Sequence, residues 1–157
     1  MHTDQEFLAQ AIEMAREGMR DNTGGPFGAV IVKDGRIIGR GANRVTSSND
    51  PTAHAEIVAI RQACEYLGDF QLSGCTLYTS CEPCPMCLGA IFWARPDRFV
   101  FAANRQDAAE GGFDDDFIYH EIDLPPHERR IPGSQLLREE GRQLFEEWRK
   151  KKDRIKY

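Results

Sequence analysis

Apolar residues recur at helical spacing along the first twenty residues. The spacing is i, i+3, i+4, i+7 and i+11, which is typical of a helix with one buried face. Thr3 precedes this run and Glu6 follows three residues later, so the two can form a capping box. The pattern therefore predicts an amphipathic helix over residues 4–19. Its apolar positions are Leu8, Ala11, Ile12, Ala15 and Met19.

The pattern then changes to short β-rich runs and further helices. Asp34-Gly35 separates two such runs and suits the positive φ angles of a tight hairpin turn. Asp50 as cap and Pro51 at the first helical position predict a helix that ends at Gly68. Strands separated by helices of this length indicate parallel crossovers, so the chain should form a mixed sheet covered by helices. The expected strands are 27–32, 36–40, 75–80 and 98–103, and further helices are expected over 85–94 and 134–150.

Composition fits one globular domain over residues 1–157. Hydrophobic residues make up 41% and charged residues 29% of 157 residues, an ordinary balance for a folded protein. There is no apolar run of about 18 residues, so no membrane span is expected. The first residues lack the pattern of a secretory signal, so a cytoplasmic protein is expected. The net charge of −5 argues against a nucleic-acid partner.

The cysteines favour a metal site over disulfides. Their number is odd, and nothing indicates secretion. Cys84 and Cys87 have the C-x-x-C spacing of a tetrahedral metal site, and His54 can supply a third ligand. Three ligands leave a fourth position open for water, as in catalytic zinc sites. The five cysteines are Cys64, Cys75, Cys81, Cys84 and Cys87.

Glu56 gives this candidate metal site a proton carrier. A carboxylate beside a metal-activated water can take a proton and pass it to a leaving amine. On one helix, residues 54 and 56 would point about 200° apart, so they can serve one metal only near the helix end. The order H-x-E followed by P-C-x-x-C is the known signature of zinc-dependent nucleobase deaminases.

Two other readings of the same residues stay open. Cys81, Cys84 and Cys87 could seed an iron–sulfur cluster, but no fourth cysteine follows at a ferredoxin-like distance. Alternatively, Cys81 could close a purely structural zinc site that binds a protein partner. Outside these two readings, Cys81 is expected to be structural, as are Cys64 and Cys75.

Several longer stretches resemble the cytidine deaminase-like superfamily, and within it the bacterial zinc guanine deaminases. The resemblance runs from about residue 24 to residue 122, with Tyr157 as a further match. The tRNA adenosine deaminases share the first two motifs, whereas the last stretch favours guanine. The matching stretches are GGPFGAV (24–30), NDPTAHAE (49–56), TSCEPCPMC (79–87), and GFDD (112–115) followed by FIY (117–119).

The resemblance implies a three-layer α/β/α cytidine deaminase-like fold with a central mixed five-stranded sheet. It also implies a homodimer in which the C-terminal segment, about 134–157, exchanges between subunits. The implied activity is a hydrolase of purine metabolism, a guanine deaminase that forms xanthine and ammonia by attack of zinc-bound hydroxide at C2. The alternatives are a tRNA adenosine deaminase or a deaminase of another small amino-heterocycle.

The resemblance also assigns site residues. One Zn²⁺ per subunit would be held by His54, Cys84 and Cys87, with Glu56 as the catalytic proton shuttle. Substrate contacts are expected from five further residues: Phe27, Asn43, Ala55, Asp115 and Tyr157 of the partner. Without the resemblance, Phe27 would be read as a core residue, Asn43 as a turn residue and Asp115 as part of a solvated acidic run.

Overall fold

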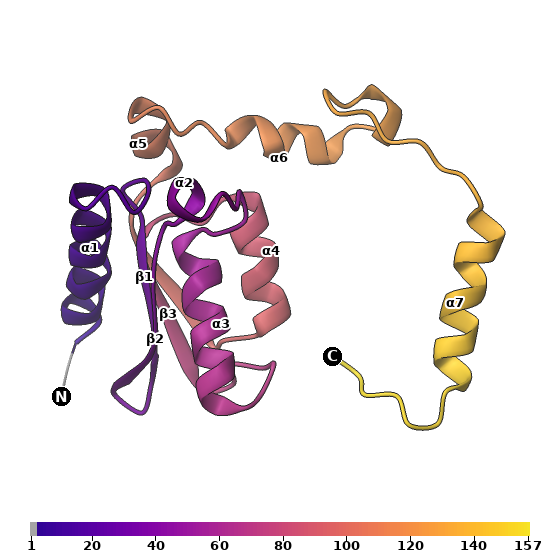
Figure 1. The fold of residues 1–157 in the computed structure, drawn as a ribbon, viewed down its shortest axis with the longest axis horizontal. Coiled ribbons are helices and arrows are strands. Elements are labelled where there is room, and N and C mark those ends of the chain that lie inside the picture. The colour runs from indigo at the N-terminus through magenta and orange to yellow at the C-terminus, as the bar shows by residue number, and fades with distance from the viewer. Residues whose placement is uncertain (1–2) are drawn as a thin grey trace. The chain divides into compact units, whose positions relative to one another are not determined.

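The computed structural model describes residues 3–157, which divide into two compact units, one extending to Asp116 and one spanning Phe117–Tyr157. The first unit holds the sheet and most of the helices (Figure 1). Its strands are β1 (Gly28–Lys33), β2 (Arg36–Ala42), β3 (Cys75–Cys81) and β4 (Arg98–Ala103). Its helices are α1 (Asp4–Arg20), α2 (Val45–Ser48), α3 (Ala55–Leu67), α4 (Pro85–Ala94) and α5 (Arg105–Glu110).

The sheet is mixed, with strand order β2-β1-β3-β4. β1 runs antiparallel to both of its neighbours, and β3 and β4 are parallel. Within residues 3–157 the sheet has four strands, so the expectation of a fifth was wrong. The four strands are those that the residue pattern predicted. After β4 the chain carries Gly111-Gly112, Pro125-Pro126 and Pro132-Gly133, which interrupt any strand, and it forms helices instead.

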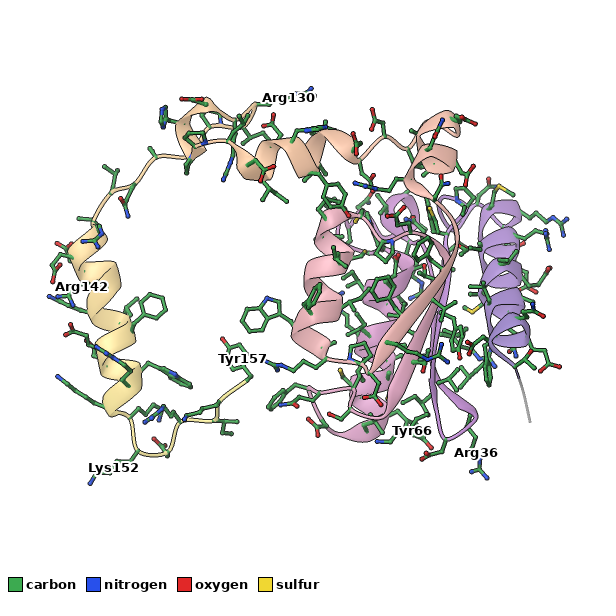
Figure 2. The ribbon with its side chains drawn as sticks, turned by 180° about the vertical axis from the view of Figure 1, so that it is seen from behind. Arg36, Tyr66, Arg130, Arg142, Lys152 and Tyr157 are labelled. Atoms are coloured by element: carbon green, nitrogen blue, oxygen red, sulfur yellow. The ribbon has the colours of Figure 1, made fainter. Side chains whose placement is uncertain are left out.

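The hairpin forms where Asp34-Gly35 predicts it. Asp34 has φ +49° and Gly35 has φ +72°, the left-handed conformations that a two-residue hairpin turn needs. Figure 2 shows Arg36 at this turn, where β2 begins.

Helices cover both faces of the sheet and make three layers (Figure 1). On one face, Phe7 and Ala11 of α1 pack with Val30, Val32 and Tyr78 of the strands. The other face carries the larger core, in which α3 and α4 cover β1 and β3. The fully buried members of this core are Ala29, Ile31, Ala55, Ala59, Ala63, Leu72, Cys75 and Leu77. The expected α/β/α layering is therefore confirmed.

The N-terminal end of α1 follows the predicted pattern closely. The capping box is present: the Glu6 backbone N–H donates to Thr3 Oγ1, and the Thr3 N–H donates to the Glu6 carboxylate at 2.7 Å. Asp4 then fastens the helix to the sheet. Its carboxylate accepts hydrogen bonds from the Tyr78 hydroxyl at 2.6 Å and from both terminal nitrogens of Arg98 at 2.7 and 2.9 Å.

Two glycines of β2 allow α3 to lie close to the sheet. A Cβ atom at Gly41 would stand 2.0 Å from the Ala55 carbonyl oxygen, and one at Gly39 would stand 2.5 Å from the Ala59 carbonyl oxygen. Real side chains cannot occupy such space, so only glycine permits this approach. Because Ala55 is the first residue of α3, Gly41 helps to fix the helix start where His54 and Glu56 lie.

The second unit contains α6 (Asp116–Asp123, which starts at the boundary), the 3₁₀ turn η1 (Pro126–Glu128) and α7 (Arg138–Lys150). Arg129 ties the turn to the end of α6 by donating to the carbonyl oxygens of Glu121 and Leu124. The labelled Arg142 of α7 (Figure 2) pairs with Glu139 and Glu146 on the same helix. None of residues 117–157 is buried.

No helix within residues 3–157 is long and apolar enough to cross a membrane.

Candidate metal centre and active site

The two cysteines of the C-x-x-C motif lie at the start of α4, where the chain leaves β3. Cys84 is the N-cap of α4 and Pro85 is the first helical residue, as the sequence predicted. The Cys84 sulfur accepts a hydrogen bond from the Cys87 backbone N–H at 3.5 Å. The helix N-terminus therefore turns both sulfurs to one side and favours negative charge there.

His54 brings its ring nitrogen to the same point from the start of α3. Its Nδ1 lies 3.5 Å from the Cys84 sulfur and 3.5 Å from the Cys87 sulfur. Two ligands of a tetrahedral zinc ion, at about 2.3 Å for sulfur and about 2.05 Å for nitrogen, stand about 3.5 Å apart. The donor set and its spacing therefore fit zinc. Among the described residues, these three form a group able to hold a metal ion, with ligand atoms within 4.8 Å of one another.

The charges in this cluster are strongly coupled. Hydrogen bonds from the Cys87 thiol and from His54 lower the pKa of Cys84 to about 4. The same hydrogen bond to Cys84, together with burial, raises the pKa of Cys87. The hydrogen bond with Cys84 raises the pKa of His54. One sulfur is thus a ready thiolate, and a cation binding here would displace the proton that Cys87 shares.

Glu56 lies beside the three candidate metal ligands and is not one of them. It is buried, at 6% exposure, in the first turn of α3. One carboxylate oxygen accepts a hydrogen bond from the Thr79 hydroxyl at 3.2 Å, and the other accepts one from the Cys87 thiol at 3.4 Å. Burial raises the pKa of Glu56. A buried carboxyl group with a raised pKa holds a proton more readily than an exposed one, which suits a group that must accept a proton and return it.

The predicted start of this helix was wrong by four residues, and the difference explains how His54 and Glu56 face one point. Asp50 does not cap a helix; its carboxylate accepts hydrogen bonds from the backbone N–H and the hydroxyl of Thr52, which makes a turn. α3 begins at Ala55, with His54 in extended conformation as its N-cap. The 200° separation expected on one helix therefore does not apply.

Asn43 and Phe27 lie next to the segment that leads into His54. The Asn43 N–H donates to the Phe27 carbonyl, and the following residue, Arg44, donates to the Ala53 carbonyl at 2.9 Å. Asn43 is buried, and its Oδ1 accepts hydrogen bonds from the backbone N–H groups of Gly25 and Val45. These two donors fix the orientation of the amide and leave its Nδ2 group turned away from them.

Phe27 packs edge-on against Phe113, with ring centroids 4.9 Å apart. Asp115 is half-buried, and burial together with the nearby Cys84 raises its pKa. The structure thus brings Phe27, Asn43, Ala55 and Asp115 into the unit that holds the cysteines and His54. Tyr157 belongs to the second unit, and its substrate contact stays a prediction.

Two neighbours of the site have no role in the sequence prediction. Phe113 lies in the matching GFDD stretch, and that stretch was the available signal. Thr79 opens the matching TSCEPCPMC stretch and is also a polar residue in an otherwise apolar alternation along β3.

Cys81 lies apart from the metal group. Its thiol contacts the Asn104 carbonyl oxygen at 3.8 Å, and burial raises its pKa to about 11. This placement weighs against both the iron–sulfur cluster and a zinc site closed by Cys81. Cys64 and Cys75 pack in or against the core under α3 and α4, as structural cysteines do.

Fold and site together define a zinc-binding deaminase. Residues 1–103 match the family described as "Cytidine and deoxycytidylate deaminase zinc-binding region", and the chain belongs to this family. It is 61% identical over 145 residues to the guanine deaminase of Bacillus subtilis strain 168, covering 92% of this chain and 93% of that protein. It is 41% identical over 139 residues to a tRNA-specific adenosine deaminase of Agrobacterium fabrum, covering 85% of this chain and 90% of that one.

Solved structures show the same likeness. The crystal structure of the Bacillus subtilis guanine deaminase matches with a TM-score of 0.97 at 57% identity, covering 99% of each chain. A guanine deaminase from Nitrosomonas europaea matches with a TM-score of 0.70 at 34% identity, covering 73% of this chain and 66% of that one.

Proposed function

We propose that this protein catalyses the hydrolysis of guanine to xanthine and ammonia. The observation that carries the proposal is the buried carboxylate of Glu56 beside the His54, Cys84 and Cys87 cluster. The reaction consumes one water, breaks the bond between C2 and its amino nitrogen, and leaves an oxygen on C2. The likeness to two guanine deaminases supports this substrate over other amino-heterocycles.

His54, Cys84 and Cys87 would hold the zinc ion. When bound by one imidazole and two thiolates, zinc supplies a Lewis acid that makes water a nucleophile at neutral pH. Glu56 then moves the protons. It takes one from the attacking water and delivers it to a ring nitrogen of the purine. It then takes the second proton from the hydroxyl group added to C2, which becomes the carbonyl of xanthine, and gives it to the departing amine.

The surrounding residues would hold the purine. Because the Asn43 Oδ1 is already engaged by two backbone donors, its Nδ2 group remains as a donor for an acceptor atom of the purine. Asp115 would accept ring N–H groups, and Phe27 would line the face of the ring. The backbone of Ala55, between His54 and Glu56, would complete the contacts.

The test is turnover of guanine by the zinc-loaded protein, with xanthine measured by chromatography and ammonia in parallel. Glu56→Gln keeps the size of the side chain, so it should retain zinc while kcat falls about 10²–10⁴-fold. Near-normal turnover by Glu56→Gln would overturn the proton-shuttle role. Absence of product from the zinc-loaded wild type would overturn the substrate, and cytosine and other amino-heterocycles would be assayed next.

A tRNA adenosine deaminase is the second candidate, because this chain is 41% identical to a tRNA-specific adenosine deaminase of Agrobacterium fabrum. Binding a tRNA loop normally requires basic surface, and the net charge of −5 opposes it. A tRNA that competes with guanine at physiological salt would favour this candidate.

We also propose a cytoplasmic homodimer that exchanges its C-terminal segment, about 134–157, so that Tyr157 covers the partner's site. The support is the exposed apolar surface of α7: Leu144 is 64% exposed and Phe145 71%. A surface of this kind on a helix needs a partner to be stable in water. All five cysteines are free, which suits the reducing cytoplasm.

A further inference from the structure

Thr79 places a hydroxyl group on the apolar face of β3. Strand alternation puts it on the same face as Cys75 and Leu77, which belong to the core under α3 and α4. Thr79 is 1% exposed. A hydroxyl at such a position is unfavourable unless it is hydrogen-bonded, and its partner is the Glu56 carboxylate.

The two oxygens of Glu56 have different partners. Oε1 accepts from Thr79 Oγ1 at 3.2 Å, whereas Oε2 accepts from the Cys87 sulfur at 3.4 Å. One oxygen is therefore tied to the sheet and the other is turned to the metal ligands. The last torsion of a glutamate side chain has no sharp preference of its own. The carboxylate also has a hydrogen bond from the backbone N–H of Glu56 itself, and the Thr79 hydroxyl adds the contact that ties it to the sheet.

The hydroxyl of Ser80, the next residue of β3, has a structural role and serves as a comparison for that of Thr79. Ser80 points to the opposite face, where its Oγ accepts a hydrogen bond from the Gly28 backbone N–H at 3.0 Å. That bond joins two strands. Thr79 instead donates to a side chain of α3 that the proposed reaction uses, so the two adjacent hydroxyls differ in the kind of partner they bind.

We propose that Thr79 is a positioning residue that fixes the carboxylate plane of Glu56, so that Oε2 carries the proton during deamination. This inference rests on the proposed function. A carboxylate free to rotate would spend much of its time misaligned, and misplacement of a reacting group by about 1 Å costs about 100-fold in rate.

Thr79→Val tests the inference because it keeps the branched shape and removes the hydroxyl. We expect kcat per bound zinc to fall about 10- to 100-fold with KM within about twofold, because the lost interaction acts on the transition state. Thr79→Ser restores the hydroxyl and should recover kcat to within about threefold. Thr76→Val makes the same change on the opposite face of β3 and should leave kcat unchanged.

Wild-type levels of kcat in Thr79→Val, or a loss that Thr79→Ser does not recover, would overturn the positioning role. Zinc content and thermal unfolding are measured for every variant. If Thr79→Val does not fold, Thr79→Ala serves as the second variant without a hydroxyl.

Crystal structures of the zinc-loaded wild type and of Thr79→Val separate this inference from the proposed function. We expect the Glu56 carboxylate to rotate in the variant while His54, Cys84 and Cys87 stay in place. An unmoved carboxylate would overturn the inference even if guanine is not the substrate. A wild type inactive on guanine would overturn the proposed function alone.

Discussion

Up to Asp116 the chain buries apolar side chains on both faces of a sheet, whereas none of residues 117–157 is buried. The first unit fastens its helices with cores, glycine contacts and buried hydrogen bonds. The second has an amphipathic helix, α7, whose large apolar residues stay exposed. Both units contain amphipathic helices. Only the first unit also contains a sheet against which the apolar faces of its helices are buried.

Loss of one metal ligand should produce the largest effect: activity is lost while the protein stays folded. Cys84→Ser removes one sulfur of the three-ligand group, so we expect zinc to be lost and guanine turnover to fall to background. Neither core cluster of the first unit contains His54, Cys84 or Cys87, so circular dichroism should show a folded protein. Unfolding on zinc removal would instead indicate a structural zinc site.

A matched pair of leucines measures the difference between the units directly. Leu72 is fully buried in the first unit, and Leu144 on α7 is 64% exposed. Leu72→Ala should lower the free energy of unfolding by about 2–5 kcal/mol, and Leu144→Ala should change that of the monomer by less than about 0.5 kcal/mol. Chemical denaturation at low protein concentration checks both values. Equal losses would contradict the comparison.

If the tail exchanges, mixed dimers should recover activity. Tyr157→Ala should lower kcat/KM about 10-fold, the size of one lost substrate contact of about 1.4 kcal/mol. Mixing it with Glu56→Gln under exchanging conditions would pair an intact Glu56 with an intact Tyr157 in one of the two sites. Recovery above the sum of the separate activities supports exchange. No recovery in dimers verified by light scattering would contradict it.

The smallest effect concerns the attachment of α1. The hydrogen bond from Arg98, and then that from Tyr78, lower the pKa of Asp4 from 3.8 to about 2. A lowered folded-state pKa stabilises the protein above pH 3.8, and this contribution is lost as the pH falls toward 2. Asp4→Asn should therefore lower Tm slightly at pH 7 and by progressively less as the pH falls below 3.8 toward 2. A difference in Tm as large at pH 2 as at pH 7 would contradict this linkage.

The sequence predicted what depends on local spacing. The capping box of Thr3 and Glu6, the turn at Asp34-Gly35 and the start of α4 after Cys84 are all confirmed. These features depend on residues a few positions apart. The family signature, H-x-E followed by P-C-x-x-C, likewise predicted the metal group that the fold assembles.

The sequence prediction failed at two positions whose side chains form hydrogen bonds that it did not include. Asp50 bonds Thr52 instead of capping a helix, which moves the start of α3 to Ala55. The hydroxyl of Thr79 was not singled out, because its partner lies on another element 23 residues away.

By itself, the sequence determined the four strands, the helices α1 and α4 and the set of metal-ligating residue types, because hydrophobic periodicity, capping and turn chemistry act between near neighbours. Tertiary structure alone decided that His54 and the two cysteines meet at 3.5 Å and that Glu56 lies between Thr79 and Cys87. Those distances depend on how closely α3 and α4 pack on the sheet. That packing is set jointly by Gly39, Gly41 and the buried core, through contacts between elements far apart in the chain.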